Sequence, residues 1–204
     1  MIRQLLATSA VLVLAACGAP EPEEAAPPAA EAPADAGKLP DMPGAPVSAA
    51  DKLTAQGYGP LRIGMTVAEI EAAMGPDADP ESVGGPDPAS CDMFRPQRAP
   101  EGLLVMVENG VLTSVWVSRN AAVETDRALN VGDTAAEVKR VYGDAAVVEP
   151  HKYQAAPAEY ITVWSTADRQ SPAARGLTYE IGADGRVESI AGGGPSIQYV
   201  EGCA

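Results

Sequence analysis

The chain has 204 residues, 28 of them acidic and 14 basic, and its formal net charge at pH 7 is −14. Because nucleic-acid binding relies on a basic footprint, this charge argues against DNA or RNA as a partner. It also disfavours peripheral binding to an anionic lipid surface.

The first 16 residues have the pattern of an export signal. Arg3 supplies a positive charge, and a mostly apolar run from Leu5 to Leu14 is too short to remain as a membrane span. The run ends in Leu14-Ala15-Ala16-Cys17, which resembles the bacterial lipobox. The resemblance implies cleavage before Cys17 and its acylation, for example with palmitate. The alternative is an ordinary signal peptide followed by an incidental cysteine.

Residues 17–50 are predicted to be the lipidated Cys17 and a disordered tether. Ala, Pro and Glu dominate this segment and aromatic residues are absent, so it cannot bury enough apolar surface to offset the entropy of ordering. Gly18, rather than Asp, follows the cysteine. By resemblance to enterobacterial lipoproteins, this implies an anchor in the outer membrane, with the folded part facing the periplasm.

Two segments further along the chain share one motif, Leu61–Gly75 and Leu129–Gly143. In each copy a Thr is followed three residues later by Glu, which is the capping box that begins a helix. The final Gly of each copy supplies the left-handed residue that ends the helix. A repeated helix unit predicts a duplicated domain, with a first repeat over residues 51–125 and a second over residues 126–204.

Strand patterns follow each predicted helix, and Asn-Gly or Asp-Gly turns connect the clearest hairpins. A helical turn is predicted for Asp51–Gln56. The predicted strands are Cys91–Arg95, Leu103–Glu108, Val111–Ser118, Glu159–Ser165, Gly176–Ile181, Arg186–Ala191 and Ile197–Val200.

The order helix, loop, strand, hairpin resembles the β-lactamase-inhibitor-protein-like fold and, in single copy, the SmpA/OmlA lipoproteins of the outer-membrane barrel assembly machinery. The segments Ile63–Gly75 and Val131–Gly143 carry the resemblance. It implies an α+β fold of two tandem repeats, each a short helix packed on an antiparallel sheet. Inhibition of β-lactamase is not implied, because the inhibitor's contact residues have no counterpart here.

Cys91 and Cys203 remain once Cys17 is assigned to lipid. An even pair of cysteines in an exported chain predicts a disulfide. The only histidine is His151, in a polar loop where we expect it to be exposed. We therefore expect no metal site, no cofactor and no catalytic triad, and we predict that the chain is not an enzyme.

Strand alternation suggests a binding face. In the first hairpin, Val105, Val107, Val111, Val115 and Val117 suit the core, whereas Leu104, Met106, Leu112 and Trp116 point the other way.

In the strand Glu159–Ser165, Tyr160 and Trp164 also point away from the core. Because aromatic residues and Met are enriched at interfaces, Trp116, Trp164, Tyr160 and Met106 form the candidate binding face. The alternatives are an alternation shifted by one residue and a second face that is itself buried.

The resulting hypothesis is a non-catalytic envelope lipoprotein. It binds a protein or peptide partner through a sheet surface, in envelope assembly, inhibition or sensing. The second hypothesis is a periplasmic module that binds a small ligand or lipid on the same surface, and the third is a hydrolase without a recognisable motif.

Overall fold

The computed structural model describes residues 51–82, 84–119 and 122–204. The predicted signal peptide, Cys17 and the tether lie outside these residues. Within the described ranges, no helix has both the length and the apolar character needed to cross a membrane.

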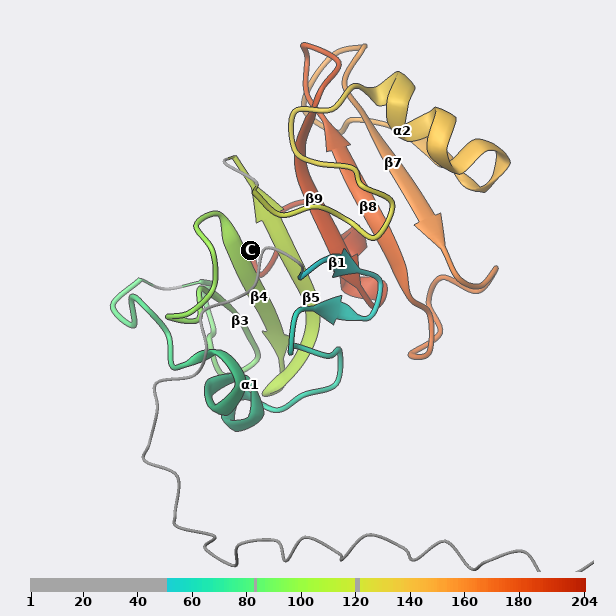
Figure 1. Ribbon diagram of the computed structural model, residues 1–204. Coiled ribbons are helices and arrows are strands. Elements are labelled where there is room, and N and C mark those ends of the chain that lie inside the picture. The colour runs from blue at the N-terminus through green and yellow to red at the C-terminus, as the bar shows by residue number, and fades with distance from the viewer. Residues whose placement is uncertain (1–50, 83, 120–121) are drawn as a thin grey trace, which may run out of the picture. The chain divides into compact units, whose positions relative to one another are not determined.

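The described residues form an α+β domain built on one large antiparallel sheet (Figure 1). Its seven strands lie in the order β3-β4-β5-β9-β8-β7-β6, so β5 and β9 pair at its centre. The strands are β3 (Cys91–Phe94), β4 (Leu103–Glu108), β5 (Val111–Ser118), β6 (Val147–Pro150), β7 (Glu159–Trp164), β8 (Gly176–Ile181) and β9 (Val187–Gly193). The other elements are β1 (Leu53–Thr54), β2 (Gly57–Tyr58), α1 (Val67–Met74), α2 (Ala135–Tyr142), and the 3₁₀ helices η1 (Gly143–Ala145) and η2 (Pro195–Gln198).

Both α-helices begin at the predicted Thr caps. At α1 the capping box is complete, because Thr66 Oγ1 accepts from Glu69 N–H and a Glu69 carboxylate oxygen accepts from Thr66 N–H at 2.8 Å. The Thr66 N–H also lowers the pKa of Glu69. At α2, Thr134 accepts from Glu137 N–H at 3.2 Å, but the Glu137 carboxylate instead lies 3.9 Å from Arg140. The first capping box is therefore confirmed, and only half of the second is present.

The segment before each helix attaches to the sheet in the same way. In both cases it exchanges backbone hydrogen bonds with the strand that follows the hairpin turn of its own half. The bonds are Gly64 N to Leu112 O, Leu112 N to Met65 O, Gly132 N to Val187 O and Val187 N to Asp133 O, all between 2.8 and 2.9 Å. The shared motif thus specifies a strand contact as well as a helix.

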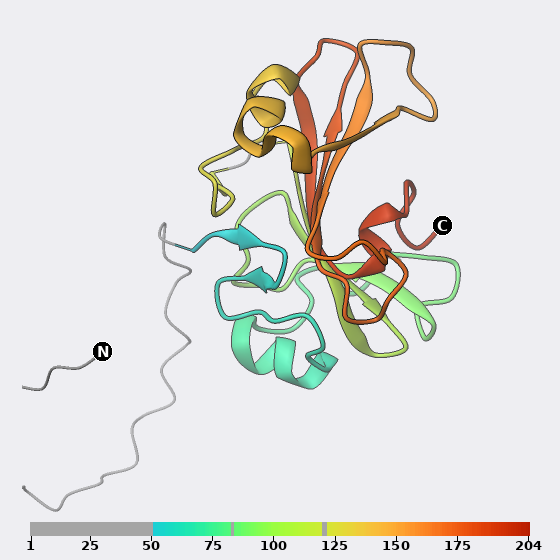
Figure 2. The same cartoon turned by 90° about the vertical axis from the view of Figure 1, so that its right-hand side faces the viewer.

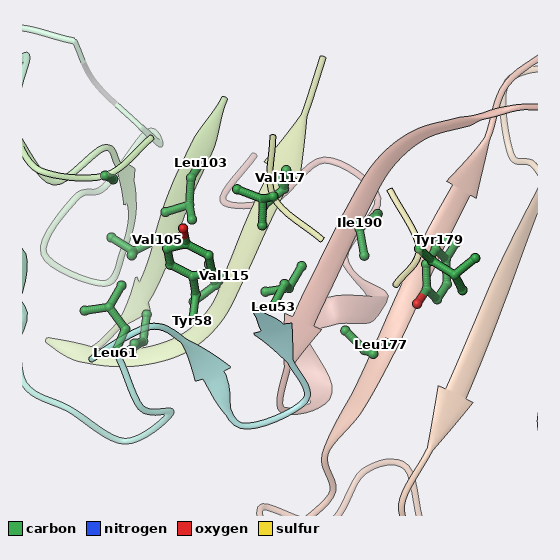
Figure 3. Packing of buried hydrophobic residues seen from close by; sticks show 14 of the residues in the cluster. Leu53, Tyr58, Leu61, Leu103, Val105, Val115, Val117, Leu177, Tyr179 and Ile190 are labelled. Atoms are coloured by element: carbon green, nitrogen blue, oxygen red, sulfur yellow. The ribbon is translucent and has the colours of Figure 1, made fainter. Parts of the chain in front are cut away.

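One face of the sheet is covered by α1, α2 and the short β1–β2 hairpin (Figure 2). The predicted helical turn at Asp51–Gln56 is wrong, because β1 pairs with β2 there. Leu53, Tyr58 and Leu61 are buried among the apolar side chains of β4, β5, β8 and β9 (Figure 3). The N-terminal hairpin therefore completes the core between the two helices.

A β-bulge shifts the alternation of β5. The register changes between Met106 and Val107, so Val107 pairs with Leu112 whereas Met106 pairs with Ser114. As a result Leu112 is buried in the core and Val111 is 37% exposed, the reverse of the prediction. An extra residue in one strand exchanges the faces of everything on one side of it.

The chain's last residues lie on the other face of the sheet (Figure 2). The predicted strand Ile197–Val200 is wrong: η2 occupies this region, with Pro195 at its start. Ile197 is buried, and the chain then runs to Cys203, which forms the predicted disulfide with Cys91 on β3, with the two Cα atoms 5.5 Å apart. The disulfide fastens this C-terminal segment across the sheet.

The close approach of β1 to β9 depends on Gly192. A Cβ added there would lie 2.5 Å from the carbonyl oxygen of Thr54. At Gly194, two residues later, φ is −81° and the nearest atom to an added Cβ is 3.6 Å away. Packing therefore requires glycine at position 192 but not at position 194.

We predict that Gly192→Ala lowers the free energy of unfolding by about 1–3 kcal/mol, the usual effect of overpacking. Gly194→Ala is the matched control and changes it by less than about 0.5 kcal/mol. Urea denaturation followed by tryptophan fluorescence measures both. Equal effects of the two substitutions would contradict the packing of β1 over β9.

A second prediction concerns the disulfide. It joins residues separated by 112 positions, and the chain-entropy model gives a stabilisation of about 4–5 kcal/mol for a loop of this size. Cys203→Ser should therefore lower the urea midpoint strongly. A reductant should destabilise the native chain to the same extent and leave the variant unchanged. Alkylation of both Cys91 and Cys203 without reductant would contradict the assignment.

Candidate functional site

A pocket of about 270 Å³ lies on the sheet face opposite the helices. Its floor consists of two rows of side chains that run across paired strands. One row is Trp116, Ala191, Thr178 and Thr162, and the other includes Ser189, Glu180 and Tyr160. The C-terminal segment lines its other side with Ile197, Gln198, Tyr199 and Val200.

The pocket exists because the central strand carries small side chains on this face. Ser189, Ala191 and Gly193 alternate along β9, and Ala191 has larger neighbours on both β5 and β8. Trp116 lies opposite Ala191 on one side, and Thr178 lies opposite it on the other. A hollow therefore forms between the indole of β5 and the polar side chains of β8.

The imidazole of His151 is buried beside the pocket, so its predicted exposure is wrong. The backbone N–H groups of Tyr153 and Gln154 donate to Nδ1, at 3.0 and 3.1 Å. Nδ1 must therefore present a lone pair, which places the ring proton on Nε2. Nε2 lies 3.1 Å from an oxygen of Glu180, and the ring stacks on Tyr160 with centroids 4.7 Å apart.

Glu180 is the best-positioned charged side chain of the pocket. One carboxylate oxygen accepts from His151, and the other accepts from the Ser189 hydroxyl at 2.7 Å. The side chain is 29% exposed. Among the described residues no Lys or Arg lies within ion-pair distance of it. The carboxylate is thus held by neutral donors and still faces the pocket.

The aromatic groups of the pocket are also fixed in place. The Trp116 indole N–H donates to the buried Ser114 hydroxyl at 2.7 Å, so the ring has no unpaired polar group to offer. Burial, and then the charge of Glu180, raises the pKa of Tyr160, which keeps its hydroxyl protonated. Burial and Glu108 similarly raise the pKa of Tyr199. The pocket therefore combines neutral aromatic rings with a carboxylate.

The structure brings together only two of the four residues predicted to form a binding face. Trp116 and Tyr160 line the pocket. Trp164 is partly buried outside it, and its ring covers the cross-strand partner Gly176. The prediction that Met106 belongs to an exposed face is wrong, because its side chain is fully buried. Its strand, β4, pairs with the disulfide-bonded β3, and the C-terminal segment runs along this part of the face.

Sequence reasoning missed Glu180, Ser189 and His151. Alternation along β8 and β9 carried a usable signal, because Thr178 and Glu180 fall on the face opposite the buried Leu177 and Tyr179. The position of His151 had no such signal, because it depends on a loop that folds back against β7 and β8. Within the described ranges, no group of three or more potential metal ligands occurs.

Comparison of the chain with protein-family models, with curated proteins and with solved structures gave no significant match. The function is therefore inferred from the residues of the pocket and from their geometry.

Proposed function

We propose that this chain is a non-catalytic binding module of the bacterial cell envelope, and that its site is the pocket between the sheet and the C-terminal segment. The observation that carries the proposal is the enclosure of aromatic rings, hydroxyl groups and one fixed carboxylate in a single hollow. Small-molecule sites typically combine apolar walls with a few convergent polar groups in this way. A volume of about 270 Å³ suits a small ligand.

We now place a small ligand ahead of a protein partner, which reverses the order of the two leading hypotheses from sequence. An open sheet face for a protein partner is less favoured, because the C-terminal segment occupies part of that face and Met106 is buried. A small ligand would bind in the pocket, the part of this face that the C-terminal segment leaves open. A protein partner remains the second candidate, since Tyr199, which lines the pocket, is 45% exposed, and Tyr153, which lines an adjoining hollow together with Tyr199, is 68% exposed.

The absence of catalysis is part of the proposal. Ser189 donates to Glu180, and His151 Nε2 also points at Glu180, so the hydroxyl and the imidazole do not form a nucleophile–base pair. Nδ1 of His151 is engaged by two backbone donors. Nucleophilic catalysis needs the base within hydrogen-bond reach of the nucleophile.

We also propose a cellular location for the protein, and its N-terminal sequence supports this proposal. The lipobox at Cys17 and the Pro-rich tether support an acylated protein held at the outer membrane and facing the periplasm. The disulfide fits an oxidising compartment. Two or more acyl chains would anchor the protein stably.

We further propose that the domain consists of two tandem repeats of the β-lactamase-inhibitor-protein-like type. Matching hydrogen bonds at Gly64 and Gly132 support this, as do the matched hairpins β4–β5 and β8–β9. In this description β6 is an addition to the second repeat. The pocket then lies where the two repeats join.

Native mass spectrometry of the full chain, recovered from its own envelope in a mild non-ionic detergent, tests the proposed function. We expect a small molecule to accompany the native chain and to be lost on denaturation. Ala191→Leu, which adds bulk to the pocket floor, should lose it. Tyr199→Ala, a change at an exposed residue of the C-terminal segment, should weaken its retention without altering the melting temperature.

The same material treated with a crosslinker distinguishes the second candidate. A stoichiometric protein crosslinked through Tyr153 or Tyr199, with no small molecule retained, would favour a protein partner. Retention of the same ligand by native protein and by folded Ala191→Leu would contradict the assignment of the pocket.

A further inference from the structure

We propose that the pocket recognises a methylated ammonium group, held between the indole of Trp116 and the carboxylate of Glu180. This inference rests on the proposed function, since it names the chemistry of the ligand for the same site. It depends on three features: the ring, the carboxylate and the space between them.

The first feature is the aromatic wall. A cation is attracted to the face of an aromatic ring within about 6 Å of its centroid, and Trp is the best of the aromatic residues in this role. The indole N–H of Trp116 is already satisfied by Ser114, so the ring needs no acceptor from a ligand and lines the pocket with aromatic surface. Tyr160 and Tyr199 add aromatic surface on the other sides.

The second feature is an inward-facing carboxylate whose hydrogen-bond partners are neutral. Glu180 accepts from Ser189 and from His151, and neither partner cancels its charge. The pocket's other charged residues are exposed at its rim: Glu149 lies 3.6 Å from Arg169, and Lys152 is solvent-exposed. Among the residues that the structure describes, Glu180 is therefore the one charged side chain on the pocket floor formed by β5, β9, β8 and β7, and it favours a cation there.

The third feature is the distance between ring and carboxylate. Trp116 is on β5 and Glu180 is on β8, with β9 between them, and Glu180 lies two residues along β8 from Thr178, which shares the row of Trp116. Spacings of about 4.8 Å between strands and about 3.4 Å per residue place the two Cα atoms about 12 Å apart. Ser189 and Ala191 on β9 leave this space open. We place the cation above Ala191 and Ser189, between the indole and the carboxylate, where both side chains line the same pocket.

The hydrogen-bonding capacity of the floor favours a methylated ammonium over a primary amine. A primary ammonium has three donors to satisfy. Each oxygen of Glu180 already accepts one bond, and the hydroxyls of Thr162 and Thr178 are bonded to each other at 3.1 Å, so part of the acceptor capacity of the floor is already used. A quaternary ammonium requires charge and aromatic contact but no acceptors, which is what the pocket supplies.

The test is a titration of the full chain in non-ionic detergent with choline, followed by amide chemical shifts and tryptophan fluorescence. The control ligand is 3,3-dimethylbutan-1-ol, which has the same shape without the charge. We expect choline, and not the alcohol, to shift the amide signals of Thr178, Ser189 and Ala191.

Three variants complete the design. Glu180→Gln keeps the size of the side chain and should weaken choline binding about tenfold or more, as should Trp116→Leu, which removes the π-face. Glu188→Gln is the matched control: it removes one charge from an exposed β9 residue that does not line the pocket, and should leave binding unchanged.

Equal binding of choline and the neutral alcohol would overturn the ammonium inference while leaving the pocket as a binding site. Absence of choline binding would also overturn it, and the native ligand found by mass spectrometry would then decide the proposed function separately. Equal losses in Glu180→Gln and Glu188→Gln would show a non-specific effect of net charge and would contradict the site.

Discussion

The pairing of β5 with β9 is the constraint on which the rest of the structure depends. It joins Ser114–Ser118 to Ser189–Gly193 and so makes one sheet of seven strands from two hairpin systems. Each hairpin system would otherwise expose a strand edge at this position, and unpaired edges invite association with other chains. The join also places the two helices on the same face of a continuous core.

The demands of this join explain the composition of β9. On the helix face, the backbone of β1 packs directly against Gly192. A Cβ added to Gly192 would lie 2.5 Å from the Thr54 carbonyl oxygen. Gly193 is approached equally closely by the Thr113 carbonyl, at 2.4 Å from its own Cβ position. On the pocket face, β9 therefore carries only small side chains, those of Ser189 and Ala191, beside Gly193. The hollow proposed as the binding site is thus a consequence of how the two halves meet.

The C-terminal segment turns this hollow into a pocket. Pro195 begins η2 and ends the strand, and the disulfide between Cys91 and Cys203 holds the chain end against β3. A sheet face that would have been open is therefore partly occupied by the chain itself. In the proposed function, this makes a small ligand the better match than a broad protein surface.

Local signals in the sequence were sufficient for much of the fold. The limits of β4, β5 and β8 are as predicted, because Asn-Gly and apolar alternation define hairpins locally; Asn109 and Gly110 both have the positive φ of the expected turn. The Thr caps, the helix-ending glycines and the disulfide could also be predicted from the sequence. The strands β1 and β2 were not, because two-residue strands have no periodicity, and β6 was missed as well.

The candidate site was less predictable for a physical reason. Trp116 and Tyr160 could be assigned to the correct face from alternation alone. Met106 is fully buried although alternation assigns it to the non-core face, and the position of Leu112 depends on a bulge. The buried ring of His151 is held by backbone N–H groups of its own loop, those of Tyr153 and Gln154. No pattern of side chains in the sequence indicates these bonds. Contacts distant in sequence and local backbone irregularities decide the site.

In the proposed function, the pocket at the β5–β9 join holds the ligand. A crystal structure of the protein isolated from its own envelope, without denaturation, tests this most directly. We expect density for a bound small molecule between Trp116 and Glu180, over Ala191. A pocket containing only ordered water, with a ligand bound elsewhere on the domain, would contradict it.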